Sequence, residues 1–332
     1  MSVAQIQAQI FQAIKSKLPA GASMADEVAL VLKVSTDSAY RRIRGEKTLD
    51  LEEAYQLCML YQLSLDNLLN LQSNAFLFTG KFVQANAFRF EDWLINVMNQ
   101  VKYMNSFKEK QMFYLAKDIP LFHHFHFREV AAFKHYFWMK SILNAPEFAH
   151  KKFRIRDYPD DYFALGKKTL EYYNQIDSVE LWNIETLNST IRQVEYYHDS
   201  NFFYNTKEIF EVYEALEKLT YKLEELATAG QKPGLSENGN ASGSYQMYFN
   251  EIIILENAQL AVLNGTKTAF LVHNVLNVMM TRDVGFCDNM YENIQNLIKK
   301  STLISTVSER ERSRFFKYLR QKIRKRKQNL KV

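Results

Sequence analysis

A short stretch near the N-terminus gathers side chains that can hydrogen-bond to bases and phosphates. Ser35 is a typical helix N-cap and Gly45 a typical residue after a helix, so a helix is predicted from Ser35 through Arg44. The exposed side of this helix carries Thr36, Asp37, Tyr40, Arg41 and Arg44. An α-helix fits the major groove of DNA, and arginine is the usual bidentate reader of guanine. The spacing therefore predicts contacts with base edges, while Arg42, Lys47 and the helix start at Ser35 suit phosphates.

Five short helices are predicted to hold this segment in a compact bundle over residues 1–72. Isoleucines recur every four positions from Ile6 and Leu18 completes their stripe, which indicates an amphipathic helix over 3–17. Serine or aspartate N-caps begin the four helices that follow, at Ser23, Ser35, Asp50 and Ser64. We expect the apolar faces of these helices to form one core, which leaves the polar side of the helix after Ser35 in solvent.

The segment from residue 23 to 69 resembles the helix-turn-helix of the lambda repressor/Cro (XRE-type) family. The matching residues are Val28-Ala29 in the first motif helix, Val34-Ser35 in the turn, Arg44-Gly45 at the end of the reader helix, and Leu63-Ser64-Leu65-Asp66 near the close. Three positions differ: Ala25 stands for the usual Gln, Lys33 for the turn Gly, and the second buried position of the reader helix moves to Ile43. The run 39–46 is closer to the BetR-like bacterial variant. The resemblance implies a DNA-binding domain.

The rest of the chain also resembles bacterial regulators that carry this reader. The matching segments are LAKDIPLFHHFHF, AAFKHYFWMKSIL and the run from KKSTLIS to ERERSRFFKYLRQKI. In those regulators the similar segments lie in a long C-terminal region that follows the reader. The resemblance therefore implies an architecture and a class of protein, but no ligand.

Basic residues gather at the C-terminal end of the sequence. Residues 308–332 hold eleven Lys or Arg and two Glu, a balance of +9 in a chain whose formal net charge is +5, so the other residues carry −4. Such a run is typical either of a nucleic-acid contact that adds non-specific affinity or of a solvated helix end.

Composition narrows the class of protein further. Apolar residues make up 47% of the 332 residues, which indicates a folded core, and the 10 Gly and 5 Pro are few enough to favour long helices. Cys58 and Cys287 cannot form a disulfide framework and fit a reducing compartment. The N-terminus lacks the pattern of a signal peptide, and no run has the ~20 apolar residues of a membrane span. We expect a cytoplasmic protein without a membrane partner.

Other candidate sites are weaker. His123, His124 and His126 invite a metal interpretation, but phenylalanines alternate with them, so we expect packed or half-exposed rings. Thr79-Gly80-Lys81 lacks the glycine spacing of a phosphate loop, and the aspartates around Pro159 suit a helix start. No Ser or Cys stands in a nucleophile elbow. The sequence therefore predicts no catalytic residue, no metal site and no cofactor.

The predicted fold is mainly α, in three parts. A helix-turn-helix bundle (1–72) precedes a helical-hairpin, solenoid-like middle domain (73–230) and a small α+β region (245–332) with a β-hairpin and a basic terminal helix. In the middle, helical periodicity covers 90–104, 107–116, 127–144, 160–175, 185–200 and 206–229. Residues 230–244 suit a loop or linker, and Asn264-Gly265 is a strong two-residue hairpin turn.

Together these features predict a sequence-specific transcription regulator that binds double-stranded DNA. Readers of this kind usually act in pairs, so we expect a homodimer, assembled outside the reader through the apolar middle and C-terminal parts or a strand edge near Asn264-Gly265. The same parts suit an unknown effector or protein partner. The alternative is a helical interaction scaffold whose N-terminal bundle binds no DNA.

Overall fold

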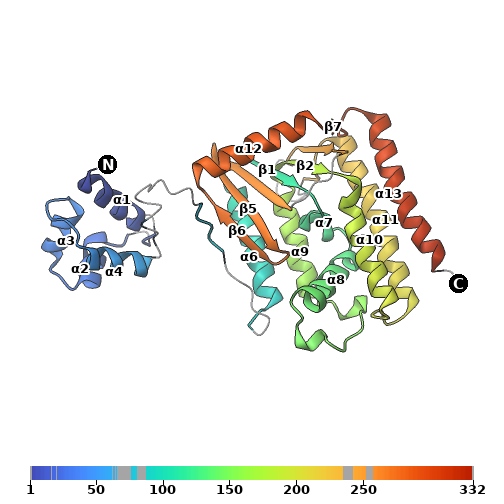
Figure 1. Ribbon diagram of the computed structural model, residues 1–332, viewed down its shortest axis with the longest axis horizontal. Coiled ribbons are helices and arrows are strands. Elements are labelled where there is room, and N and C mark those ends of the chain that lie inside the picture. The colour runs from blue at the N-terminus through green and yellow to red at the C-terminus, as the bar shows by residue number, and fades with distance from the viewer. Residues whose placement is uncertain are drawn as a thin grey trace. The chain divides into compact units, whose positions relative to one another are not determined.

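The computed structural model describes residues 2–15, 17–19, 21–61, 63, 65, 76–80, 87–234, 242–251 and 257–330. The chain divides into two compact units, Met1–Leu77 and Phe78–Val332. Figure 1 shows helices as the regular elements among the described residues of the first unit, and a mixed sheet with helices in the second.

The first unit is a bundle built around the predicted apolar stripes. Its described helices are α1 (Val3–Lys15), α2 (Met24–Leu32), α3 (Thr36–Ile43) and α4 (Leu51–Tyr61). Ile10, Ile14, Val28, Ala39 and Leu57 meet in one buried core. The predicted fifth helix from Ser64 lies, apart from Leu65, outside the described residues.

The second unit is built on a seven-stranded sheet. Its strands are β1 (Lys110–Leu115), β2 (Asp177–Trp182), β3 (Tyr245–Phe249), β4 (Ala258–Leu263), β5 (Thr266–Asn274), β6 (Asn277–Thr281) and β7 (Thr302–Leu303). The order across the sheet is β6-β5-β4-β1-β2-β3-β7. β1, β2 and β3 are parallel, with Phe113 opposite Val179 and Leu181 opposite Tyr248. β4, β5 and β6 form an antiparallel meander beside β1, and β7 runs antiparallel to β3.

Helices make the crossovers that parallel strands require. α6 (Phe90–Asn105) precedes β1, and α7 (Leu121–His124), α8 (Arg128–Phe137) and α9 (Asp160–Tyr173) join β1 to β2. α8 continues as a π-helical turn, Trp138–Ile142, and the short 3-10 turns Pro146–Phe148 and Ile155–Asp157 follow. α10 (Ile184–Asp199) and α11 (Thr206–Ala229) join β2 to β3, and α12 (Val284–Lys299) and α13 (Glu309–Asn329) follow the meander.

Both faces of the sheet are covered. Met112 and Tyr114 of β1 belong to the large core shared with α6–α11 and α13. Phe113, between them, belongs to a smaller core with Cys287 and Ile294 of α12. Alternate residues of a strand point to opposite faces. Central strands of this sheet are therefore buried on both sides.

The prediction of a mainly α fold is wrong. Of the described residues, 59% are helical and 15% lie in strands, and the sheet is a substantial domain rather than a small C-terminal hairpin. Residues 107–116, predicted as a helix, contain β1, and β2 was not predicted at all. A strand buried on both faces lacks the polar alternation that identifies a half-buried strand, so periodicity alone does not separate it from a buried helix segment.

The Asn264-Gly265 turn is present and joins β4 to β5. Both residues have positive φ, 45° and 81°, as the two-residue turn requires. The expected free strand edge beside this turn is absent, because β4 is paired with β1 and β5 with β6. The strands from the predicted middle and C-terminal parts thus share one sheet.

The predicted linker 230–244 lies inside the second unit and joins α11 to β3. Gly230 ends α11 with φ 65°, and the backbone of Gln231 pairs with that of Ser244. Residues 235–241 are outside the described part of the chain. Among the described residues, none of the helices has the length and apolar character needed to cross a membrane.

Candidate nucleic-acid interface

A short turn over residues 33–35 joins α2 to α3, in the segment where the helix-turn-helix was predicted. Lys33 ends α2 in the left-handed conformation (φ 52°) and its N–H bonds to the carbonyl of Ala29. The lambda repressor/Cro family, which this segment resembles, has glycine at this position. Lys33 thus adopts a left-handed backbone conformation that glycine adopts more readily. Two residues later, the Ser35 hydroxyl accepts the Ser38 N–H at 3.2 Å and begins α3.

Most of the predicted contact residues lie on the exposed surface of α3 and the turn after it. Ser35, Thr36, Asp37, Tyr40, Arg41, Arg44 and Lys47 are all exposed. The Arg41 and Arg44 side chains are 56% and 59% exposed. Thr36 also bonds back to Asp26 at 3.4 Å, which ties the start of α3 to α2. These seven side chains form one polar face.

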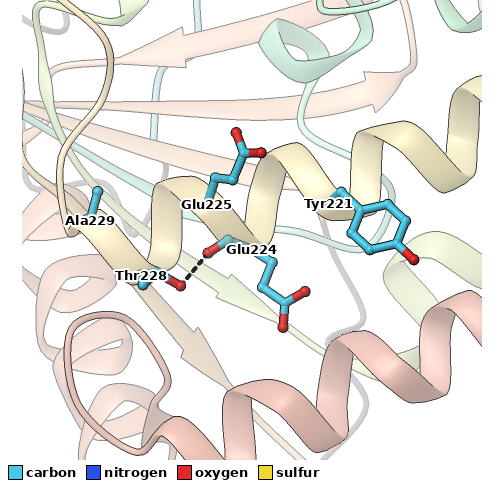
Figure 2. A pocket seen from close by; sticks show the side chains of 5 residues that line it. All are labelled: Tyr221, Glu224, Glu225, Thr228 and Ala229. Carbon is cyan, nitrogen blue, oxygen red and sulfur yellow. Dashed lines mark hydrogen bonds between the residues drawn. The ribbon is translucent and has the colours of Figure 1, made fainter.

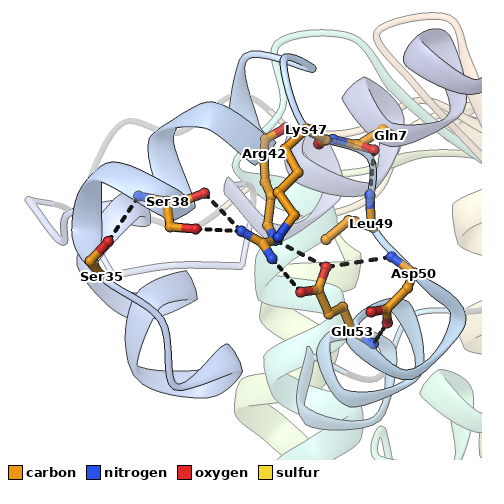
Figure 3. Close-up of polar contacts among 8 residues, drawn as sticks. All are labelled: Gln7, Ser35, Ser38, Arg42, Lys47, Leu49, Asp50 and Glu53. Atoms are coloured by element: carbon orange, nitrogen blue, oxygen red, sulfur yellow. Dashed lines mark hydrogen bonds and ion pairs between the residues drawn. The ribbon is translucent and has the colours of Figure 1, made fainter.

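Arg42 is the exception, because its side chain is only 2% exposed. Its guanidinium binds the two carboxylate oxygens of Glu53 at 2.5 and 2.9 Å and donates to the carbonyl and hydroxyl of Ser38 (Figure 3). The predicted phosphate contact of Arg42 is therefore corrected: this side chain anchors α3 on α4. The hydrogen bond from Arg42 is the main reason why the pKa of Glu53 is lowered.

Gln7 is a positioning residue that the sequence did not reveal. Its side-chain N–H groups donate to the carbonyls of Arg42 (2.6 Å) and Lys47 (2.7 Å), and its carbonyl accepts the Leu49 N–H at 2.9 Å (Figure 3). α1 thereby fixes the chain immediately after α3. In the sequence, Gln7 is a polar residue next to Ile6 of the apolar stripe, and nothing marks it as a functional residue. Only its burial in the folded structure, at 4% exposure, reveals its role.

One acidic side chain, Glu46, lies close to both exposed arginines. Glu46 lies 3.8 Å from Arg41 and 3.3 Å from Arg44, and all three side chains are about half exposed. Exposed ion pairs of this kind are worth about 0–1 kcal/mol, so an incoming anion or base edge can displace Glu46. Residues 1–77 hold seven basic and eight acidic residues, a net charge of −1. The first unit therefore offers no net positive charge to an anionic partner, and its cations are available only locally.

The second unit contains a buried polar cluster centred on Glu180 of β2, which is 0% exposed. Its carboxylate accepts hydrogen bonds from four side chains: His123 (2.8 and 3.0 Å), Tyr173 (2.5 Å), Trp182 (2.7 Å) and Tyr245 (2.9 Å). Burial alone would raise the pKa of Glu180, but the charge and hydrogen bond of His123 and the hydrogen bonds from Tyr173 and Trp182 outweigh it and lower the pKa to about 2. The cluster was not predicted.

The three histidines do not meet around one point that suits a metal. His123 binds Glu180, whereas His124 is buried and His126 half-buried, and both have lowered pKa values of about 3, mainly because burial disfavours the charged ring. Within the described residues, no group of three or more His, Cys, Asp or Glu side chains could hold a metal ion.

A shallow hollow on α11 is lined by Tyr221, Glu224, Glu225, Thr228 and Ala229 (Figure 2). Both of its acids are already paired, Glu224 with Arg320 at 2.5 Å and Glu225 with Lys222 at 3.0 Å. One helix alone lines the hollow, so it does not enclose a ligand as binding pockets do.

Comparisons of the chain with protein-family models, with curated proteins and with solved structures found no match. The helix-turn-helix resemblance therefore rests on the residues quoted above.

Proposed function

We propose that the chain is a transcription regulator and that its first unit reads double-stranded DNA with α3. One observation carries the proposal. α3 is held from within the bundle by Ala39 and Arg42, and it presents Tyr40, Arg41 and Arg44 on its opposite, exposed side. A helix that is rigidly supported on one face and rich in donors on the other is what the major groove accepts.

The proposed contacts follow from the position of each side chain. Arg41 and Arg44 are three residues apart and so lie close together on one helix face, where each can meet a guanine edge once Glu46 is displaced. The N–H groups at the start of α3, beside Ser35 and Thr36, suit a phosphate, as does Lys47. Arg42 has no part in these contacts.

We expect Arg41→Ala and Arg44→Ala each to reduce discrimination between the preferred and a scrambled site by about 1–3 kcal/mol, because each removes a bidentate base contact. Genome-wide selection of DNA fragments with the purified protein supplies the preferred site, and titrations with both duplexes measure the difference. Glu46→Gln is expected to act in the opposite direction and raise affinity, because it frees both arginines.

Lys15→Ala is the matched control, since Lys15 is an exposed cation of α1 in the same unit but off the α3 face. It should leave the preferred sequence unchanged. If both arginine variants kept full preference for the selected site, α3 would not be the reader.

A protein-interaction module is the second candidate function. It is favoured by the net charge of −1 and by an exposed apolar stripe on α4, where Leu51, Tyr55 and Met59 are 88%, 61% and 62% exposed. Contiguous exposed apolar patches are typical of surfaces that bind other proteins. Failure of the fragment selection to enrich any sequence would favour this second function.

We expect the protein to be a homodimer, because one reader covers one half-site and specificity usually needs two. Light scattering on the full chain should give about twice the mass of the 39.1 kDa chain. The variant Leu51→Ser/Met59→Ser should keep this mass if the dimer forms outside the reader. A monomer that binds an asymmetric site one-to-one would contradict the expectation.

A further inference from the structure

All the basic residues of α13 except Lys322, which lies over the ring of Tyr318, fall into two groups with different surroundings. The helix packs on the second unit through Phe315, Phe316, Leu319 and Ile323, all buried. Five basic residues are hydrogen-bonded to other parts of the second unit: Arg312 to two backbone carbonyls, Arg320 to Glu224, Arg324 and Lys327 to Glu217, and Arg326 to Glu195. Arg312 holds the start of α13 against the segment before it, and the other four hold α13 against α10 and α11, so this part of the basic run is structural.

The other group forms what we call the outward stripe: Arg310, Arg314, Lys317 and Lys325. All four are exposed, and none forms an ion pair with a described residue. At 100° per residue they fall within about 80° of one another, on the side opposite the buried apolar residues, and they span about 22 Å along the helix. The two acids of α13, Glu309 and Glu311, lie in its first turn and flank the stripe on either side.

We propose that the outward stripe is a second contact with the DNA backbone, an inference that rests on the proposed function. Its four cations are held on a well-packed helix and carry no acid between them, which suits a row of phosphates. DNA presents one negative charge about every 1.7 Å of its axis, so a stripe of this length can neutralise several of them. Because lysine and arginine donate to phosphates without distinguishing bases, the stripe adds affinity and not sequence preference.

The packing of α13 favours DNA over a membrane surface. An amphipathic helix that binds a membrane buries its apolar face in the lipid. Here that face is buried in the protein, with Phe316 and Ile323 both 0% exposed. The stripe also supplies what the reader lacks, since residues 1–77 have a net charge of −1.

The test uses the full chain carrying Arg310→Gln, Arg314→Gln, Lys317→Gln and Lys325→Gln together. Binding to a random-sequence duplex and to the selected site is measured as a function of salt. If all four side chains meet phosphates, the slope of log affinity against log salt becomes less steep by about 3.6, and the wild type loses about 100-fold more affinity than the variant between 50 and 200 mM salt. The ratio of affinities for the selected and random duplexes should not change.

A charge-matched control removes four exposed lysines elsewhere on the second unit: Lys108, Lys168, Lys299 and Lys300. It should keep the wild-type slope, and tryptophan fluorescence checks that both variants are folded. A wild-type slope in the stripe variant, or an equal loss in the control, would overturn the inference and leave the reader proposal standing. A stripe variant that lost binding to phosphatidylserine vesicles but not to DNA would also overturn it. If the wild type binds neither duplex, the proposed function itself fails.

Discussion

Replacing Glu180 with glutamine is expected to lower the free energy of unfolding of the second unit by about 3–5 kcal/mol. The carboxylate receives four donors in a site with no solvent exposure. The glutamine side chain keeps one acceptor oxygen, but its NH2 group would face side chains that are themselves donors. It also leaves His123 without a negatively charged partner. Buried donors without an acceptor keep their full desolvation cost.

Tryptophan fluorescence during denaturant unfolding measures this loss selectively. The three tryptophans, Trp93, Trp138 and Trp182, all belong to the second unit, and Trp182 itself donates to Glu180. Glu292→Gln is the matched control, because Glu292 is exposed on α12; its effect should stay within about 0.5 kcal/mol. Equal midpoints for the two variants would show that the cluster contributes little.

The same carboxylate predicts a dependence of stability on pH. The pKa of Glu180 is lowered to about 2 in the folded protein, below its ordinary value of 4.5. A lowered folded-state pKa contributes stability that is complete above the unfolded-state value and is lost as pH falls towards the folded-state value. Wild-type stability should therefore fall by about 3 kcal/mol from this group between pH 4.5 and 2, and Glu180→Gln should lack this component.

Replacing Glu53 with alanine is expected to destabilise the first unit by about 3 kcal/mol, and unfolding of that unit would also remove the DNA binding proposed above. The substitution leaves the Arg42 guanidinium buried at 2% exposure without its partner. It also removes a helix cap, because Glu53 and Asp50 bond to each other's backbone N–H groups at 3.4 and 2.8 Å at the start of α4. Hydrogen exchange over residues 24–61 reports on this unit, which has no tryptophan.

The paired variant Arg42→Met/Glu53→Gln separates the cost of an unpaired charge from the loss of contacts. It removes the buried charge and keeps a side chain that can cap α4, so it should be more stable than Glu53→Ala. If the double variant were the less stable of the two, the ion pair itself would be a net source of stability.

Much of the structure of the first unit could be predicted, because its helix starts and apolar stripes depend on residues close together in the sequence. Ser23 and Ser35 begin helices through side-chain caps a few residues away, and the apolar stripe through Ile10 and Ile14 repeats with the helical period. The exposed face with Arg41 and Arg44 follows from the same period. The role of Arg42 did not follow, because its partner Glu53 lies on another helix.

In the second unit the long helices and the hairpin turn could be predicted from the sequence, whereas the sheet could not. α11 spans the residues whose periodicity predicts it, and Asn264-Gly265 turns the chain by its local φ preferences. β1 and β2 are strands only because each is paired and covered on both faces by distant segments.

Helix starts, turns and the grouping of residue types along the chain follow from the sequence alone, because they depend on neighbours within a few positions. Which charges remain available to a partner follows only from the folded structure. It pairs Arg320 and Arg326 with acids of α11 and α10 and leaves Arg310 and Arg314 outside, although all four belong to one basic run. It likewise brings His123, Glu180 and Tyr245 together from distant segments. The physical reason is that pairing and burial are properties of packed surfaces, and those surfaces exist only once the chain has folded.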